Sequence, residues 1–465
     1  MEFLLAIGAL VGLFWVGVVL LRGGLIGAAL LVLLAGSCFG HPFFNLPAGP
    51  LPLTSDRLLL AVLMIQYGIY RRWGWTDPKP LAKSDYLLGA FLVVLVASTL
   101  THDFQYRKAQ PLSQLVLFYL MPAVLYWVVR QSEWTEQSAR WVFSSLAVFA
   151  AYLCLTAIAE TQQAWSFVFP TYVGSPEFSE FLGRGRGPFL NPAANGIVQG
   201  LGLCAALMSW PRLNRPGKLL LLATLPLFAW GVYSTFTRSV WIGAALALLI
   251  VITLTTPRSW RLAVLGTAML VSVAIVAASW EHVGAFKRDK YVSVEDVAES
   301  AKLRPILAVV AWHMFLDRPL LGCGYGQYIQ ESPPYTADRT ADLPLEKARP
   351  YVQHNVLLAM LTETGLLGMG LFVALLASWT RTAWRLWRTQ TAPAWVRQMG
   401  LLFLALMCVY LTNGMFHDVS IIPMVHMLLF FLAGAIMGLS PWLAVVPSAE
   451  RLRVWLPDEE LATVS

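Results

Sequence analysis

Charged residues are scarce in this chain. Asp, Glu, Lys and Arg make up only 13% of its 465 residues, whereas hydrophobic residues make up 57%. Soluble domains carry about 25% charged residues, so the composition excludes an ordinary globular protein. The chain also lacks the polar–apolar alternation of membrane strands, and its apolar runs are about 17 to 25 residues long, enough to cross a bilayer as helices. We therefore predict an all-α integral membrane protein.

Several chemical signatures are missing as well. The five cysteines show no CxxC spacing, so neither a zinc site nor a disulfide framework is predicted. The chain has no Asp-x-Asp pair, no HExxH, no Walker loop and no nucleophile elbow. These absences argue against metal-dependent sugar transfer from a nucleotide donor and against ATP-driven transport. We expect neither a metal nor a cofactor.

Apolar segments occur throughout the chain and predict about 12–13 transmembrane helices. The first has neither a basic start nor a small-residue cleavage site, so we expect a span and not a cleaved signal peptide. The thirteen segments are residues 3–21, 24–39, 57–70, 85–100, 112–129, 141–159, 193–210, 218–234, 239–255, 262–280, 355–379, 399–416 and 420–440. The predicted parts are N-terminal transmembrane helices (1–281), a large periplasmic loop containing short helices (282–353), C-terminal transmembrane helices (354–440) and a cytoplasmic tail (441–465).

The basic residues predict the orientation in the membrane. The formal net charge is +7, but Lys and Arg lie in short loops between apolar segments, which indicates membrane topology and no nucleic-acid partner. One set of connections holds 18 of them and the alternate set holds 6, apart from the 9 in the long loop. The set of 18 is expected to face the cytoplasm. The loops 160–191, 235–238 and 282–353 then face outward together.

The long loop contains a second kind of helix. Between Leu303 and Leu316 the apolar residues recur at helical spacing, over a stretch too short to span a bilayer. We expect this helix to lie along the outer membrane face. The glycine-rich sequence at 322–326 follows as a flexible turn, and no predicted strand precedes it, so a dinucleotide-binding fold is not indicated.

Polar residues near the outer end of the seventh segment form the first candidate site. Arg184 and Arg186 could clamp a phosphate, or could be interfacial residues that extend toward water. Asn191, Asn195 and Gln199 follow at intervals of four and share one helix face. This stripe predicts either a wet cavity or polar contacts between helices.

A second group lies at later helix ends. Arg238 stands at a tight outward turn, where its planar guanidinium suits a phosphate or anchors the helix at the interface. His354 precedes a long apolar helix and is a candidate general base, because histidine titrates near neutral pH; a capping role is the alternative. Glu363 lies on the opposite face of that helix from His354, and we expect it to be a structural partner inside the bundle.

Two smaller clusters complete the candidates. His313 and Asp317 are four residues apart on the loop helix and could pair with each other. Asn413, His417 and Asp418 gather at the outer end of the twelfth segment and could line the site.

Several of these motifs together resemble the O-antigen ligase and O-antigen polymerase superfamily of bacterial membrane glycosyltransferases. They appear in family order and cover roughly residues 180–370. Two departures are Ala193-Ala194, where a second asparagine often follows Asn-Pro, and one helix more than the usual twelve. The matching pieces are Arg184–Pro192, Thr237–Trp241, Arg304 through Asp317 to Gly324, and His354-Asn355 through Glu363 to Gly368.

The resemblance implies a metal-independent, inverting transfer of a glycan from an undecaprenyl-diphosphate-linked oligosaccharide to a glycan or glycolipid acceptor. The catalytic residues would be His354, as the base that activates the acceptor hydroxyl, and Arg238, which with Arg184 and Arg304 would hold the diphosphate. The protein would be a multi-pass protein of the bacterial inner membrane with a periplasmic active site. The expected substrate-binding residues are Arg184, Arg186, Asn191, Arg304, His313 and His417.

Two forms of this activity differ in the acceptor that receives the glycan. A ligase joins the chain to a lipid A core or a protein, whereas a polymerase joins it to another lipid-linked repeat; the late position of the large loop favours the ligase. A polysaccharide or lipid transporter is a different class and predicts an internal repeat with paired broken helices. A scaffold without catalysis would make the outward clustering of Arg184, Arg238 and His354 a coincidence.

Overall fold

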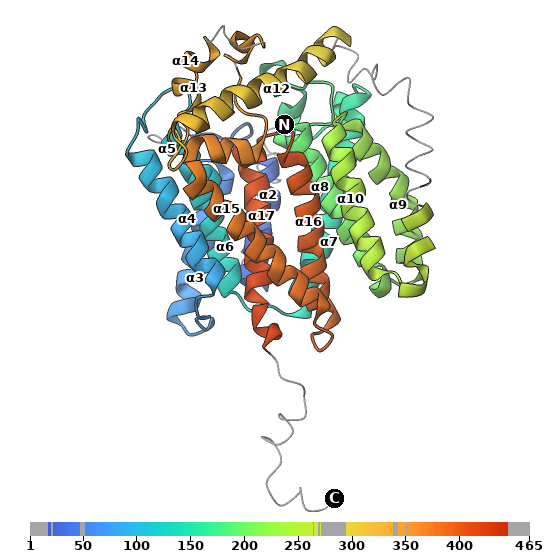
Figure 1. The fold of residues 1–465 in the computed structure, drawn as a ribbon. Coiled ribbons are helices and arrows are strands. Elements are labelled where there is room, and N and C mark those ends of the chain that lie inside the picture. Colours follow the sequence, from blue (N-terminus) through green and yellow to red (C-terminus); the bar gives the residue numbers. More distant parts are fainter. Residues whose placement is uncertain are drawn as a thin grey trace, which may run out of the picture.

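The computed structural model describes residues 17–19, 22–46, 52–263, 265–267, 270, 294–337, 343–349 and 351–444, with the side chains of 294–302 left out. The predicted segments 3–21 and 262–280 and the tail 441–465 therefore lie wholly or largely outside the described residues. Figure 1 shows a bundle of helices that run up and down, with one long helix lying across its upper end.

Each of the eleven predicted segments in the described part is a helix, so the all-α prediction is confirmed. Within the described residues, eight helices are long and apolar enough to cross a membrane; the apolar helices α2 and α17 are shorter. The bundle consists of α2 (Gly24–Cys38), α3 (Ser55–Arg72), α4 (Lys83–Leu100), α5 (Pro111–Leu115), the π-helix η1 (Val116–Leu120), α6 (Met121–Gln131), α7 (Glu136–Thr161), α8 (Pro192–Met208), α9 (Arg215–Ser234), α10 (Arg238–Thr255), α15 (Val356–Arg388), α16 (Ala394–Gly414) and α17 (Pro423–Gly438).

The helices divide into a buried centre and an exposed periphery. α8, α16 and α17 are buried along most of their length. α3, α4 and α9 instead expose large apolar side chains, among them Ile65, Val93 and Leu219. Exposed apolar surface of this extent would be unfavourable in water and suits contact with lipid chains. The distribution agrees with a membrane-embedded bundle.

Short helices join the long ones. They are η2 (Trp165–Phe167), η3 (Thr171–Gly174), η4 (Pro176–Phe178), η5 (Gly187–Phe189), η6 (Trp210–Arg212), α12 (Val294–Asp317), α13 (Tyr328–Glu331), α14 (Pro333–Thr336), η7 (Leu345–Ala348), η8 (Val419–Ile421) and η9 (Ser440–Leu443). The predicted loop helix is present within α12, which begins earlier than expected. It lies across the upper end of the bundle, near α13 and α14 (Figure 1).

The upper layer has an apolar core of its own. We call the described residues of 303–349 the cap. Ile306, Val310 and Met314 of α12 pack with Cys323 and Leu345 in a cluster separate from the main core of the bundle. Leu358, in the first turns of α15, packs against the same cluster. The start of α15 is therefore anchored to the cap as well as to the bundle.

α15 is broken at Gly365, where φ is 62° and ψ is −164°. A helix interrupted there loses backbone hydrogen bonds, which would be costly in an apolar environment. The segment 319–324 of the cap supplies the missing partners. Four backbone hydrogen bonds join the two segments: Leu366 N to Pro319 O (2.8 Å), Leu367 N to Leu320 O (3.2 Å), Cys323 N to Thr362 O (2.9 Å) and Gly324 N to Glu363 O (3.0 Å).

Glycine makes this close contact possible. Gly322 and Gly365 both have positive φ, and a Cβ on either would lie 2.4 Å from a backbone carbonyl carbon of the facing segment. The Glu363 carboxylate also accepts a hydrogen bond from the Gly326 amide at 3.0 Å. The expectation of a flexible turn at 322–326 is therefore wrong, because this segment is fixed against the break in α15. Glu363 makes the kind of structural contact that was expected of it.

Candidate functional site

His354 lies where the cap passes into the bundle. It immediately precedes Asn355, whose side-chain oxygen caps α15 by accepting from the amides of Leu357 (2.9 Å) and Leu358 (3.1 Å). The side-chain amide of Asn355 donates to the Met415 carbonyl at 3.2 Å, just beyond the end of α16. These contacts place the half-buried His354 between the cap and the upper ends of α15 and α16.

Arg304 of α12 lies near the same place. Its guanidinium carbon is 5.4 Å from the ring centroid of Phe416, which follows α16. Burial and the positive charge of Arg304 lower the pKa of His354. Burial and the positive charge of Arg238 lower the pKa of Arg304 in turn. The charge of Arg238 thus acts on Arg304 and the charge of Arg304 acts on His354, so the three groups are linked electrostatically.

Arg238 begins α10, and its surroundings fix that helix end. Ser239 donates to the side-chain oxygen of Asn413 at 2.9 Å, which ties the start of α10 to the end of α16. The guanidinium of Arg184 donates to the carbonyls of Thr235 and Phe236 and to the hydroxyl of Thr237, at 2.6 to 3.3 Å. Arg184 thus shapes the turn that presents Arg238.

Arg186 is placed very differently from Arg184. Its side chain is fully buried and donates to the carbonyls of Val173, Phe178 and Glu180. The Glu160 carboxylate lies 3.9 Å from its Nε and accepts the amide of Gly187 at 2.8 Å. Arg186 therefore holds the loop 173–187 together with bonds inside the protein.

The asparagine stripe also makes contacts inside the protein. Asn191 caps α8 by accepting from the amides of Ala193 and Ala194. Asn195 donates to the Gly185 carbonyl at 2.9 Å, and Gln199 donates to the Leu153 carbonyl at 3.1 Å. Asn195 and Gln199 are fully buried. The structure thus places this stripe among contacts between α8, α7 and the preceding loop.

The remaining candidates belong to α12 and to the segment that follows α16. His313 is half-buried on α12, and Asp317 accepts a hydrogen bond from the Tyr335 hydroxyl at 2.6 Å. His417 directly follows Phe416, the ring that Arg304 covers. Asp418 accepts from the amide and hydroxyl of Ser420, and burial raises its pKa to about 6. His417 is therefore closer in the chain than His313 to Phe416, the residue that Arg304 contacts.

Comparison with known proteins identifies a family model that part of the chain matches. The family model described as O-antigen ligase matches residues 220–373, the stretch that contains Arg238, Arg304 and His354. This match supports the resemblance to the O-antigen ligase superfamily. No curated protein matches the chain. A match to this family implies a membrane glycosyltransferase of the O-antigen ligase or polymerase kind, which acts on a lipid-linked glycan.

Sequence reasoning missed two aromatic residues of this candidate site. Phe416 supplies the ring under Arg304, and the ring of Tyr351 lies 6.4 Å from that of His354. Both precede a predicted site residue in the chain, Phe416 by one position and Tyr351 by three. Their closeness in the chain to a predicted site residue was the only indication that the sequence offered. The contact of Arg304 with Phe416 joins residues more than a hundred positions apart, so no local pattern predicts it.

The chemistry available at the site follows from these groups. Both guanidinium groups are positively charged, and the charge of one acts on the other. Two such groups favour the binding of an anion between or beside them. A half-buried imidazole with a lowered pKa is neutral at neutral pH and can accept a proton. Among the residues that the structure describes, no group of three or more His, Cys, Asp or Glu could hold a metal ion. Independence of metal stays a prediction.

Proposed function

We propose that the protein is a metal-independent, inverting glycosyltransferase of the ligase type. It transfers a glycan from an undecaprenyl-diphosphate-linked donor to a hydroxyl of a glycan or glycolipid acceptor, at the periplasmic side of a bacterial inner membrane. The observation that carries the proposal is the electrostatic group of His354, Arg304 and Arg238 at one end of the bundle, within the stretch that matches the family model.

The proposed step needs one base and one anion-binding group. His354 takes the proton of the acceptor hydroxyl while the oxygen attacks the anomeric carbon from the face opposite the diphosphate. The bond from that carbon to the phosphate oxygen breaks, and its electron pair leaves with undecaprenyl diphosphate. Attack from the opposite face inverts the anomeric configuration.

The two arginines stabilise the leaving diphosphate. Charge-assisted hydrogen bonds from a guanidinium are stronger than neutral ones, and their planar geometry matches phosphate oxygens. Arg304 also acts on the base, because its charge helps to keep the His354 imidazole unprotonated. A neutral imidazole can accept the proton of the acceptor, whereas an imidazolium cannot.

A transporter is less well supported than an enzyme. Transporters use paired broken helices whose freed backbone groups bind the substrate. α15 is broken at Gly365, but the segment 319–324 occupies the freed backbone groups with four hydrogen bonds. The break therefore serves the attachment of the cap.

The test is transfer by the purified protein. We expect wild-type protein to transfer glycan from a lipid-diphosphate oligosaccharide in EDTA, and His354→Ala to lose more than about 10²-fold in rate, the scale of a general base. Arg238→Ala should lose a comparable factor, since it removes a charge from the leaving group. Arg107→Ala is the matched control, because Arg107 is exposed and belongs to the loop between α4 and α5. Figure 1 shows α5 at the same end of the bundle as α12.

The acceptor is tested in the same assay. A lipid A core or protein acceptor distinguishes the ligase from the alternative polymerase, for which a second lipid-linked repeat is the acceptor. Full activity of both the His354 and Arg238 variants would refute the proposed site, and a strict requirement for a divalent ion would refute the metal-independent mechanism.

A further inference from the structure

A cavity of about 270 Å³ lies beside α2, apart from the residues assigned to the transfer step. Its polar lining comes from the end of α2 and the start of α3: Ser37, His41, Thr54, Asp56 and Arg57. Small-molecule sites in proteins have volumes of about 300–1,000 Å³, so the cavity has room for one small polar group such as a single sugar ring. The fold described so far gives it no role.

The polar wall offers both signs of charge. The Asp56 carboxylate accepts from the Thr54 hydroxyl, and the Arg57 guanidinium donates to the Pro52 carbonyl. The Nε of Arg57 is buried and has no hydrogen-bond partner among the described residues. His41 is exposed at the rim, with its ring nitrogen 2.8 Å from the side-chain amide of Asn45. A ligand here meets both donors and acceptors.

The rest of the lining is apolar and aromatic. It includes Phe189, Met424 and Met427, together with Tyr172, whose hydroxyl lies within hydrogen-bond distance of the carbonyls of Cys38 (3.0 Å) and Pro188 (2.9 Å). A sugar ring has apolar C–H faces and a rim of hydroxyl groups, so it matches a lining that is partly apolar and partly polar. A phosphate fits less well, because the Asp56 carboxylate would repel it.

The cavity shares two chain segments with the candidate site. Phe189 belongs to η5, which follows Arg184 and Arg186, and Ile422 follows His417 and Asp418 along the chain. A lipid chain would find a more suitable lining elsewhere, since an apolar groove of about 590 Å³ lies on another face of α2, against α7. The mixed polar and aromatic lining therefore favours carbohydrate in the smaller cavity.

We infer that this cavity is a second sugar-binding subsite, which holds one sugar unit of the donor or the acceptor glycan away from the bond being made. The inference rests on the proposed function for its biological substrate. The binding itself depends only on the lining residues. Asp56 is the central acceptor for sugar hydroxyls, and Arg57 and His41 are the donors.

The first test measures binding without transfer. Protein in lipid nanodiscs is titrated with free neutral hexoses, a hexuronic acid and inorganic phosphate, and binding is followed by saturation-transfer NMR. We expect at least one of the sugars to bind, and Asp56→Asn or His41→Ala to weaken it about ten-fold, the usual effect of losing a hydrogen bond to a charged group. Asp103→Asn is the matched control, because Asp103 is exposed at the same end of the bundle. His354→Ala should leave this binding unchanged.

The second test identifies the source of the sugar. In the transfer assay, Asp56→Asn should raise KM while kcat changes less than about two-fold, because a remote contact binds ground state and transition state alike. A raised KM for the lipid-linked oligosaccharide assigns the sugar to the donor, and a raised KM for the acceptor assigns it to the acceptor.

Three outcomes would overturn the inference. The first is equal sugar binding by wild type, Asp56→Asn and His41→Ala, when thermal unfolding shows that all three proteins are folded. The second is binding of phosphate and of no sugar. The third is an unchanged KM for both substrates. If His354→Ala keeps full transfer activity, the proposed function fails, while the binding test still decides whether the cavity takes a sugar.

Discussion

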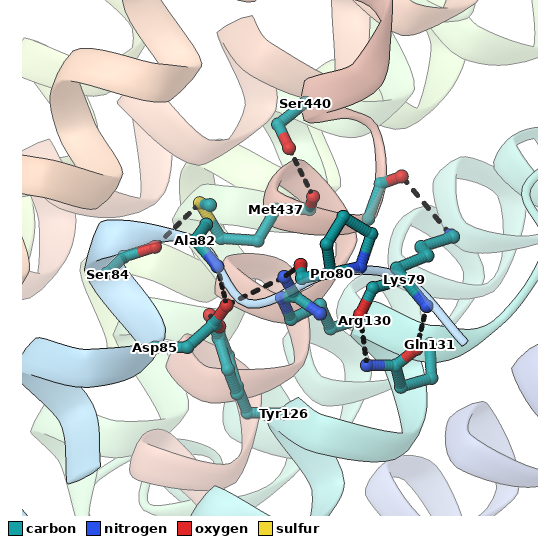
Figure 2. A network of polar contacts seen from close by, with 11 residues as sticks. Lys79, Pro80, Ala82, Ser84, Asp85, Tyr126, Arg130, Gln131, Met437 and Ser440 are labelled. Atoms are coloured by element: carbon teal, nitrogen blue, oxygen red, sulfur yellow. Dashed lines mark hydrogen bonds and ion pairs between the residues drawn. The ribbon is translucent and has the colours of Figure 1, made fainter.

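The two ends of the bundle hold their arginines in different ways. At the lower end, Arg130 lies 2.7 Å from the Asp85 carboxylate, and both side chains are almost completely buried. Asp85 also accepts from the Tyr126 hydroxyl and the Ala82 amide, both at 2.6 Å. Figure 2 shows this network with the dashed contacts between α4, α6 and the loop before α4. At the upper end, Arg304 covers the face of Phe416, and the charge that acts on it most is the like charge of Arg238.

The difference is between an arginine that is paired inside the protein and two arginines that we propose to bind the donor diphosphate. A buried charge is tolerated when a paired opposite charge and hydrogen bonds compensate it, as Asp85 compensates Arg130. Lys79, beside this network, donates to the carbonyls of Ser132 and Gly438, and burial lowers its pKa to about 8. The charges of the lower end are thus used within the protein. The charge of Arg238 instead acts on the like charge of Arg304, an arrangement that we expect to attract an anion.

The same substitution at both ends tests this comparison. Arg130→Met leaves the buried Asp85 without its partner, and breaking a buried ion pair costs about 3–5 kcal/mol. We expect a strongly lowered melting temperature and little folded protein in detergent, measured by fluorescence-detected size exclusion and thermal unfolding. An Arg130→Met variant as stable as wild type would show that the two ends do not differ in this way.

Arg304→Met should have the reverse effect. The methionine side chain can still pack on Phe416, so the free energy of unfolding should change by less than about 1 kcal/mol. The transfer rate should fall by about 10²–10³-fold, because a preorganised charge on the leaving group is lost. The comparison fails if Arg304→Met unfolds the protein as readily as Arg130→Met does.

Gly365→Ala probes the attachment of the cap, which carries Arg304. A Cβ there would lie 2.4 Å from the Leu320 carbonyl carbon at a positive φ, so we expect a loss of about 1–3 kcal/mol in stability and reduced transfer. Gly370→Ala is the control on the same helix, since a Cβ at that position meets nothing within 4 Å. Equal melting temperatures for the two variants would argue against the docked arrangement.

The pH dependence of transfer gives the smallest expected effect. Histidine has an ordinary pKa of about 6.5, and burial and Arg304 lower it at His354. Because the base must be neutral, kcat/KM should rise with pH through this lowered pKa and then level off. Arg304→Met removes a positive charge that disfavours the imidazolium, so the acidic limb should move to higher pH. An acidic limb at the same pH in wild type and Arg304→Met would show that the charge of Arg304 does not act on the pKa of His354.

The membrane spans could be predicted from the sequence because hydropathy is a local property. Eleven predicted segments are helices in the described part, and the loop helix lies within α12. The grouping of His354, Arg304 and Arg238 came from the family resemblance, since no spacing rule connects them. Arg184 and Arg186 show what sequence reasoning could not decide, because only one glycine separates them. Arg184 stabilises the turn before Arg238, whereas Arg186 is buried among carbonyls of its own loop. Tertiary contacts decide between these roles.

The break in α15 was equally beyond sequence reasoning, because its partners lie some forty residues earlier in the chain. It has a mechanical consequence. With 319–324 bonded across the break and Leu358 packed on the cap, α12 and the first turns of α15 form one packed unit. The relative position of Arg304 and His354 is therefore set within that unit, whereas Arg238 is held separately at the start of α10.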